Sequence, residues 1–414
     1  MADPTREAAF DVLTAVLDRR RTIEDALSAL PDMDRRDRAA AHRLAAAVLR
    51  RMGTLDAVLE PYLRKEPPAP ARNVLRIGAA GLLLLGTPEH AAVATAVALA
   101  RAKGLAPFAG LANAVLRRVA QAGAAAMDDL DSARLDTPAW LWASWGSQAR
   151  AIAEAHRVEA PLDLTIGPRG ADVAPEAVRL PTGTVRYPAG TLVADVPGSA
   201  DGRLWAQAAA AALPARLLGA RPGELVADLC AAPGGKTGQL AAAGASIVAV
   251  ERDAARLARL RENLSRWGLR AETVQADAAA WRPDTRFDAI LLDAPCGATG
   301  TIRRHPDVAR SKRPGDIVSL VQAQDKLIAA ALDLLKPGGR LVYAVCSLQP
   351  EEGAPRLAAA LARGGARAEP FRPDELPELP EALTQDGHLR TLPSMWGDRG
   401  GMDGFFAGRL VKAG

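Results

Sequence analysis

The chain has 414 residues, enough for two or three domains, and its 49% hydrophobic and 24% charged residues are typical of a globular protein rather than a disordered or fibrous one. The most apolar stretch, residues 77–86, is too short to cross a bilayer, and the start of the chain lacks the apolar core of a signal peptide. We therefore expect a cytoplasmic protein without membrane contact. Net charge is only +4, but residues 1–126 carry 18 Lys and Arg against 13 Asp and Glu, a net of +5 that weakly favours a polyanionic partner.

Residues 5–126 are predicted to be all-helical, because apolar residues recur at spacings of three and four. Residues 127–138 have the acidic residues and proline of a linker. From 139 to 220 the pattern is mixed: a helix at 139–156, strand-like pieces at 162–166, 184–190 and 191–198, and an Ala-rich helix at 204–218.

From residue 221 onward, apolar strands alternate with helical patterns. The strand candidates are residues 224–231, 246–251, 271–277, 287–295 and 339–347, with a last strand at 404–411. The clearest helices are residues 253–268 and 317–339. Near-continuous apolar strands with helical crossovers predict a doubly wound parallel sheet. The domains are thus a helical bundle (1–126), a small mixed α/β subdomain with its linker (127–220) and an α/β domain (221–414).

A glycine turn follows the first strand of the α/β domain, with Gly234 and Gly235 opening the next helix. Cys230 stands where a P-loop requires glycine, and GxGxxG is absent, so neither phosphate-binding loop fits. A nucleoside ligand without a phosphate tail remains.

Acidic residues end the next three strands: Glu251, Asp277 and Asp293. A carboxylate after the second strand suits two ribose hydroxyls, and one after the third suits an adenine amino group. Acids end strands by chance too, so each is weak alone. Together with the glycine turn, this spacing favours S-adenosylmethionine.

Two cysteines end neighbouring strands of the expected sheet, Cys296 after Asp293 and Cys346 after residues 339–345. With Cys230 they are the only three cysteines, and no Cys or His lies at metal-ligand spacing, which argues against disulfides and zinc. Carbon-5 of a pyrimidine is a poor nucleophile, but a thiolate added at carbon-6 makes it one. We expect Lys236 or the sulfonium of the methyl donor to raise the thiolate fraction, and Asp293 to hydrogen-bond the cytosine edge.

The segments 228–237, 287–307, 334–353 and 403–412 resemble the Sun (Fmu) family of RNA cytosine-C5 methyltransferases, and residues 75–119 resemble its NusB-like domain. The pairing resembles the RsmB type, which the family associates with 16S ribosomal RNA. The resemblance implies an N-terminal all-α NusB-like RNA-binding bundle and a Rossmann-like class I methyltransferase domain that uses S-adenosylmethionine without a metal. We expect a monomer.

By this resemblance, Cys346 is the nucleophile and Cys296 assists product release, whereas spacing alone does not choose between the two thiols. The implied cofactor contacts are the methionine-binding loop of Cys230, Ala231, Ala232, Pro233, Gly234, Gly235 and Lys236, and the carboxylates Glu251, Asp277 and Asp293. The chain departs from the family at Val345, where threonine is usual, and at Gly297, where serine is common.

Several residues have plainer interpretations. The thiol of Cys230 is expected to pack, and His305 to be structural. Arg303 and Arg304 are predicted to face phosphates, and the acids of residues 350–352 to complement a helix dipole. Two functions remain as alternatives: a transfer RNA cytosine-C5 methyltransferase, and a non-catalytic NusB-related RNA-binding protein.

Overall fold

The computed structural model describes residues 3–414 and divides into two compact units. The helical unit comprises the described residues up to Val158 together with Ile302–Lys312. The sheet unit comprises Glu159–Thr301 and Arg313–Gly414. The domain boundaries drawn from sequence pattern, after residues 126 and 220, stay a prediction. Within residues 3–414, no helix has both the length and the apolarity needed to span a membrane.

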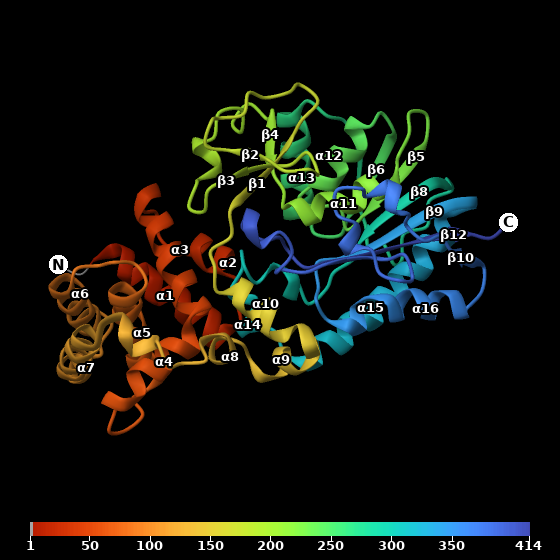
Figure 1. Cartoon of the computed structure of the whole chain (residues 1–414). Coiled ribbons are helices and arrows are strands. Elements are labelled where there is room, and N and C mark those ends of the chain that lie inside the picture. Colours follow the sequence, from red (N-terminus) through yellow and green to blue (C-terminus); the bar gives the residue numbers. More distant parts are fainter. Residues whose placement is uncertain (1–2) are drawn as a thin grey trace. The chain divides into compact units, whose positions relative to one another are not determined.

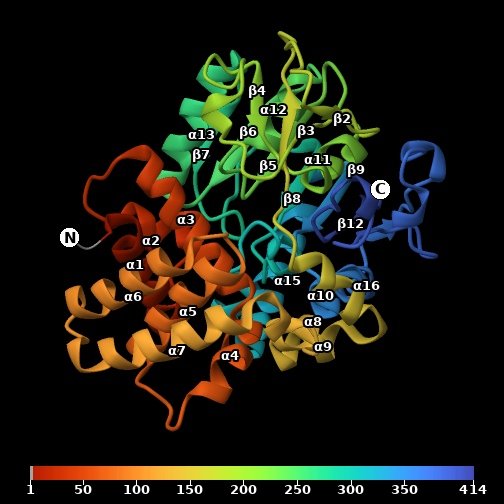
Figure 2. The same ribbon diagram turned by 60° about the vertical axis from the view of Figure 1, so that its left-hand side comes forward.

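The helical unit confirms the helical pattern of residues 5–126. Its packing follows the predicted spacing: in α3, Ala41, Leu44, Ala45 and Val48 are all buried, which are positions i, i+3, i+4 and i+7. Figure 2 shows α5, α6 and α7 lying side by side, in agreement with their mutual contacts. The helices of this unit are α1 (Pro4–Arg19), α2 (Ile23–Ser28), α3 (Arg35–Arg50), α4 (Met52–Leu59), α5 (Ala69–Leu83), α6 (Glu89–Ala102), α7 (Ala109–Ala122), α8 (Ser132–Asp136), α9 (Ala139–Trp145), α10 (Ala149–His156) and α14 (Val308–Ser311).

Residues 127–158 differ from the prediction in two places. The expected linker contains α8, whose Asp136 accepts hydrogen bonds from Arg51 Nε (2.9 Å) and the Thr54 amide (2.8 Å). The single helix expected at 139–156 is two helices, because Gly146 takes a φ of 54° and ends α9.

The segment 302–312 packs within the helical unit although it lies far along the chain. Arg50 donates a hydrogen bond to the carbonyl of Arg303 (2.9 Å), and His305 Nδ1 lies 3.0 Å from Glu24 Oε1. Arg303 is only 2% exposed, so the expectation that it faces phosphate is wrong: its side chain is buried in packing. His305 has the structural role expected of it.

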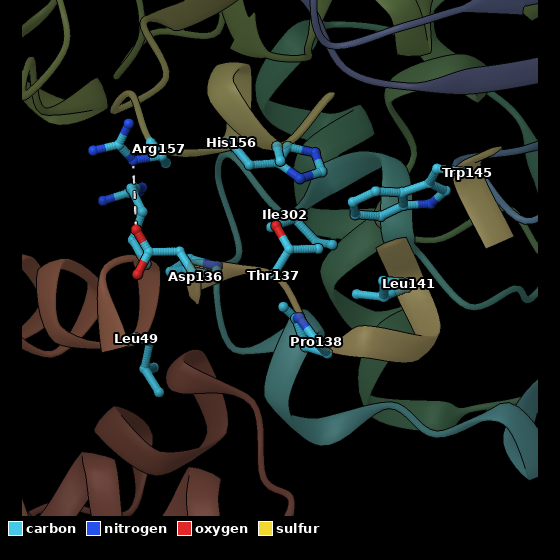
Figure 3. A pocket seen from close by; sticks show the side chains of 13 residues that line it. Leu49, Asp136, Thr137, Pro138, Leu141, Trp145, His156, Arg157 and Ile302 are labelled. Carbon is cyan, nitrogen blue, oxygen red and sulfur yellow. Dashed lines mark ion pairs between the residues drawn. The ribbon is translucent and has the colours of Figure 1, made fainter. Parts of the chain in front are cut away.

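A cavity of about 20 Å³ lies beside this segment, lined by residues of α3, α8, α9, α10 and α14 together with Ile302 (Figure 3). Figure 3 shows Arg157 paired with Asp136, with 3.4 Å between Arg157 Nε and Asp136 Oδ2. It also shows the His156 ring beside Trp145. Burial, with the charges of nearby arginines, lowers the pKa of His156 to about 3, so its imidazole is neutral. This volume suits one water molecule and excludes a larger ligand.

The sheet unit begins with a small antiparallel sheet of order β2-β3-β1-β4. The strands are β1 (Leu162–Ile166), β2 (Val178–Arg179), β3 (Val185–Tyr187) and β4 (Leu204–Ala206). The prediction of a strand at 191–198 is wrong, since only a short 3₁₀ turn forms there. The predicted helix 204–218 begins only at Ala209, because Leu204 and Trp205 pair with β1 and Trp205 stacks on Trp267 at 4.7 Å.

The large sheet has the order β10-β12-β9-β8-β5-β6-β7, with β11 also pairing with β12. Strands β7, β6, β5, β8 and β9 are parallel, whereas β12 runs antiparallel to β9. Its strands are β5 (Leu225–Leu229), β6 (Ser246–Glu251), β7 (Glu272–Gln275), β8 (Phe287–Asp293), β9 (Leu335–Val345), β10 (Ala366–Ala368), β11 (Leu389–Thr391) and β12 (Phe405–Lys412).

Helices cover both faces of this sheet (Figure 1). In β8, Ile290 and Leu292 belong to the core beneath α15 and α16, while Ala289 and Leu291 face α11. The helices are α11 (Ala209–Leu218), α12 (Gly235–Ala242), α13 (Ala254–Trp267), α15 (Pro314–Leu334) and α16 (Ala354–Ala362). The predicted doubly wound sheet is confirmed, as is the adjacency of β8 and β9.

Candidate active site

A cavity of about 470 Å³ is lined by residues at the carboxyl ends of β5, β6, β8 and β9. In such sheets ligands bind at this edge where the strand order reverses, which here occurs at β5 between β8 and β6. From the sequence-selected set, the cavity wall contains Cys230, Ala232, Glu251, Asp277, Asp293, Cys296 and Cys346. Helix α15 also lines the cavity, with Ser319, Gln322 and Lys326. The sequence analysis did not predict these three residues, because helical periodicity alone does not indicate which polar residues face a cavity.

Most residues of the turn between β5 and α12 lie behind the cavity wall and do not line the cavity. Ala231, Pro233, Gly234, Gly235 and Lys236 do not line the cavity itself. Gly234 has a φ of 104°, and a Cβ there would lie 3.2 Å from Leu260 Cγ, so the turn requires glycine for its conformation. The Ala231 amide donates to the Val250 carbonyl (3.1 Å), which ties the turn to β6.

Two carboxylates stand at the ends of β6 and β7. Glu251 is 2% exposed and its Oε1 accepts from the Asp253 amide (3.1 Å). Its buried Oε2 has no hydrogen-bond partner within residues 3–414, although the Arg256 guanidinium lies 3.3 Å away. Asp277 accepts from the Ala279 amide (2.9 Å) and borders the same cavity. A buried acceptor without a donor fits a ligand that brings hydroxyl groups.

Lys236 leaves the turn and reaches Asp293 on β8. Its Nζ lies 2.6 Å from Asp293 Oδ2 and 5.3 Å from the centre of the Phe405 ring. Burial alone would lower the pKa of Lys236, but the attraction of Asp293 and of Cys346 outweighs it and the pKa is raised. The ammonium group therefore stays charged beside the cavity.

The two predicted thiols meet. Cys296 Sγ and Cys346 Sγ are 3.5 Å apart, and both border the cavity. The neighbouring backbone holds them, since the Ala294 amide donates to the Ala344 carbonyl (2.9 Å) and the Gly300 amide to the Cys346 carbonyl (3.1 Å). The hydrogen bond with Cys346, together with burial, raises the pKa of Cys296 well above its ordinary value, so this thiol keeps its proton.

The third cysteine, Cys230, has a thiol that is expected to stay protonated. Burial and the charges of Asp293 and Glu251 raise the pKa of its thiol to about 12. A neutral, half-buried thiol agrees with the packing role expected for it. All three cysteines are free.

Sequence reasoning missed two buried acids. Asp228 is 1% exposed within β5 and accepts from the Thr237 hydroxyl (2.6 Å), and burial raises its pKa to about 7. Its signal was a lone charge inside an apolar strand. Glu352 was interpreted as a helix-dipole acid, but it is 0% exposed and accepts from the Gly297 amide (2.9 Å), so that interpretation is wrong for this residue. Only the exposed neighbour, Glu351, can have such a role.

The sheet order, the antiparallel β12 beside β9 and the strand-end acids together define a Rossmann-like, S-adenosylmethionine-dependent methyltransferase domain. Sequence models agree: that of the 16S rRNA methyltransferase RsmB/F family matches residues 215–411, and that of the NusB family matches residues 3–121.

Curated relatives are similar to this chain over nearly their whole length. "Ribosomal RNA small subunit methyltransferase B" of Pseudomonas putida is 36% identical over 98% of this chain and 98% of its own length. The protein with the same name from Xylella fastidiosa is 37% identical over 98% of this chain and 99% of its own. The chain therefore belongs to the RsmB/F family of 16S rRNA methyltransferases and carries a NusB-family domain.

Solved structures show the same fold. The crystal structure of PH0851 superposes with a TM-score of 0.78 at 20% identity, covering 100% of this chain and 99% of that one. A methyltransferase homolog protein from Pyrococcus horikoshii gives a TM-score of 0.54 at 27% identity over 69% of this chain and 96% of its own. NSun6 from Pyrococcus horikoshii, solved with SFG, superposes with a TM-score of 0.54 at 20% identity, covering 67% of this chain and 98% of that one.

Proposed function

We propose that this chain methylates carbon-5 of a cytosine in 16S ribosomal RNA through a transient bond between Cys346 Sγ and carbon-6 of the base. The observation that carries the proposal is the pair of sulfurs, 3.5 Å apart, in one cavity with Asp293. Two thiols without metal-ligand partners fit covalent chemistry better than binding alone.

S-Adenosylmethionine would supply an electrophilic methyl group when bound, and its sulfonium sulfur would keep the bonding electron pair, so that S-adenosylhomocysteine is the leaving group. Glu251 is proposed to accept from the ribose hydroxyls, which would satisfy its buried Oε2, and Asp277 from the adenine amino group. The turn from Cys230 to Lys236 is proposed to hold the methionine part. The cavity of about 470 Å³ has the size usual for a cofactor of this kind.

We propose a separate role in the reaction for each of the residues around the base. The Cys346 thiolate adds to carbon-6, the ring electrons move to carbon-5, and carbon-5 takes the methyl group. A base removes the carbon-5 proton, the ring double bond re-forms, and the Cys346–carbon-6 bond breaks. Asp293 is proposed to hydrogen-bond the cytosine edge. We assign the thiolate to Cys346 by the family resemblance, and the separation of 3.5 Å between the two sulfurs supports Cys296 as its helper in product release.

The helical unit offers a place for the RNA. A hollow of about 710 Å³ between residues 62–68 and α7 presents the rings of Tyr62 and Phe108. Its charged wall includes Arg64, Lys65 and Arg118, exposed cations whose side chains form no ion pair within the described chain. Cations for phosphates and rings for stacked bases are the usual elements of a single-strand binding surface. We propose that unit as a seat for RNA.

Transfer of a tritiated methyl group to unmodified small-subunit RNA tests the mechanism. Cys346→Ala is expected to lose at least ~10³-fold in rate, as removal of a nucleophile does, while calorimetry with S-adenosylmethionine shows wild-type affinity. Cys296→Ala is expected to form a protein–RNA complex that survives denaturing electrophoresis. Undiminished transfer by Cys346→Ala, or trapping only in that variant, would reject the assignment.

The two alternatives have their own readouts. Bisulfite sequencing of a strain lacking the gene would reveal lost 5-methylcytosines in transfer RNA if that were the substrate. Absence of any binding of S-adenosylmethionine to the wild-type chain would favour a non-catalytic RNA-binding protein.

A further inference from the structure

The carboxylate of Glu352 lies between the two cysteine-bearing turns. It is completely buried, and both oxygens face the Gly297 amide, at 2.9 and 3.1 Å. Oε2 also accepts from the Ser347 hydroxyl, and Oε1 from Gln324 Nε2 at 2.9 Å. The carboxylate therefore has donors from three separate segments of the sheet unit.

These donors are adjacent to the sulfurs in sequence. Gly297 follows Cys296, and Ser347 follows Cys346, so one carboxylate joins the turn after β8 to the turn after β9. Hydrogen bonds to an ionised acceptor are stronger than neutral ones, and a buried carboxylate left without donors is unfavourable. Glu352 therefore restrains both turns at once.

Other contacts hold the carboxylate itself in place. The Tyr343 hydroxyl donates to the Glu352 carbonyl (2.7 Å), which fixes the backbone of the 3₁₀ turn Pro350–Glu352. Gln324 on α15 also donates to the Pro295 carbonyl (2.9 Å), so the residue before Cys296 is tied to the same point. The carboxylate has little freedom to follow a moving partner.

We propose that Glu352 is a positioning residue that sets the separation of Cys296 Sγ and Cys346 Sγ, acting through Gly297 and Ser347 without touching the substrate. The substitution Glu352→Gln replaces one carboxylate oxygen with an NH₂ group and removes the charge. The Gly297 amide then has one acceptor in place of two, and the remaining hydrogen bonds are weaker, while the shape is kept. The kinetic part of this proposal rests on the proposed function; the sulfur separation does not.

Disulfide formation between the two cysteines measures that separation directly. In glutathione buffers, two protein thiols and one oxidised glutathione yield one protein disulfide and two reduced glutathiones, so electrons and protons balance. The effective concentration of the pair, read by mass spectrometry of the quenched protein, reports how well the fold holds the sulfurs together. We expect Glu352→Gln to lower it about tenfold. Glu351→Gln, on the same turn but exposed, is the matched control and should equal wild type.

A second variant perturbs the same contact from the other side. A Cβ on Gly297 would lie 3.0 Å from Glu352 Oε2 and 2.6 Å from Ile317 Cδ1. Gly297→Ala should therefore shift the effective concentration in the same direction with no change in charge, and Glu352→Asp should fall between wild type and Glu352→Gln. Near-ultraviolet circular dichroism of each variant verifies that it is folded.

Methyl transfer separates the two proposals. Glu352→Gln is expected to lower kcat about tenfold with little change in the KM for S-adenosylmethionine. Equal effective concentrations in Glu352→Gln, Glu351→Gln and wild type would overturn the positioning role, as would a wild type that forms no disulfide. A changed effective concentration together with full activity in Cys346→Ala would leave the positioning role intact and reject the proposed mechanism.

Discussion

Asp228 makes the stability of the sheet unit depend on pH in a direction opposite to that of most carboxylates. Its side chain lies inside β5, its Oδ2 accepts from the Thr237 hydroxyl, and its Oδ1 has no hydrogen-bond partner among residues 3–414. Burial therefore raises its pKa from 3.8 to about 7. Asp228→Asn keeps the shape and removes the titration.

The magnitude follows from linkage. A raised native pKa means that the folded state holds a proton that the unfolded state releases, so stability falls as pH rises from about 4 to about 7 and is constant above that. A pKa difference of about three at 1.36 kcal/mol per unit is ~4 kcal/mol in all. Between pH 5 and 8 the wild type should lose ~3 kcal/mol relative to the variant, or ~5–10 °C in Tm for a unit of this size.

Thermal unfolding of both proteins in matched buffers from pH 5 to 8 measures the difference. The loss of a hydrogen bond on substitution adds an offset that does not depend on pH, so only the slope matters. Asp288→Asn on β8 is the control: Lys336 and the Leu225 amide lower the pKa of that carboxyl, so its difference from wild type should be flat over this range. A flat difference for Asp228→Asn as well would refute the reasoning.

The remaining predictions concern the cofactor, the RNA and the fold. Glu251→Gln should weaken S-adenosylmethionine binding ~10–100-fold in calorimetry, the effect of losing hydrogen bonds to a charged acceptor. Arg118→Glu should weaken RNA binding and reduce the slope of log affinity against log salt concentration by about one to two. Arg117→Glu changes the charge equally but lies outside the hollow, so its effect on affinity and slope should be smaller. Gly300→Ala should cost at least ~2 kcal/mol in denaturant unfolding, because its Cβ would lie 1.9 Å from the Gly404 carbonyl oxygen, whereas Gly315→Ala meets nothing within 4 Å.

The sheet could be predicted because its central strands are buried on both faces. Long apolar runs such as residues 287–295 have no other stable location, and strands of one direction bring their end residues to one edge. The meeting of Asp293, Cys296 and Cys346 follows from that geometry. Strands β10 and β11 were missed because each has three residues, too few to establish a period.

Periodicity also fails where side chains make specific contacts. Glu351 and Glu352 are adjacent acids on one turn, and nothing local distinguishes the exposed one from the one that accepts hydrogen bonds at 0% exposure. The partners of Glu352 come from the turn after β8, the turn after β9 and α15, which lie apart in sequence. The prediction for Arg303 was wrong for the same reason, because the residues next to it in the sequence do not indicate that distant segments bury it.

The membership of Ile302–Lys312 in the helical unit constrains how this protein can be rearranged. A chimera that exchanges only the amino-terminal helices with a relative would leave this segment facing foreign partners in place of Arg50 and Glu24. Because the segment begins six positions after Cys296, such a transplant would disturb the strand end where the thiols meet unless residues 302–312 travel with the helices. Recombination at a single crossover is thereby disfavoured, and the two halves are expected to be inherited together.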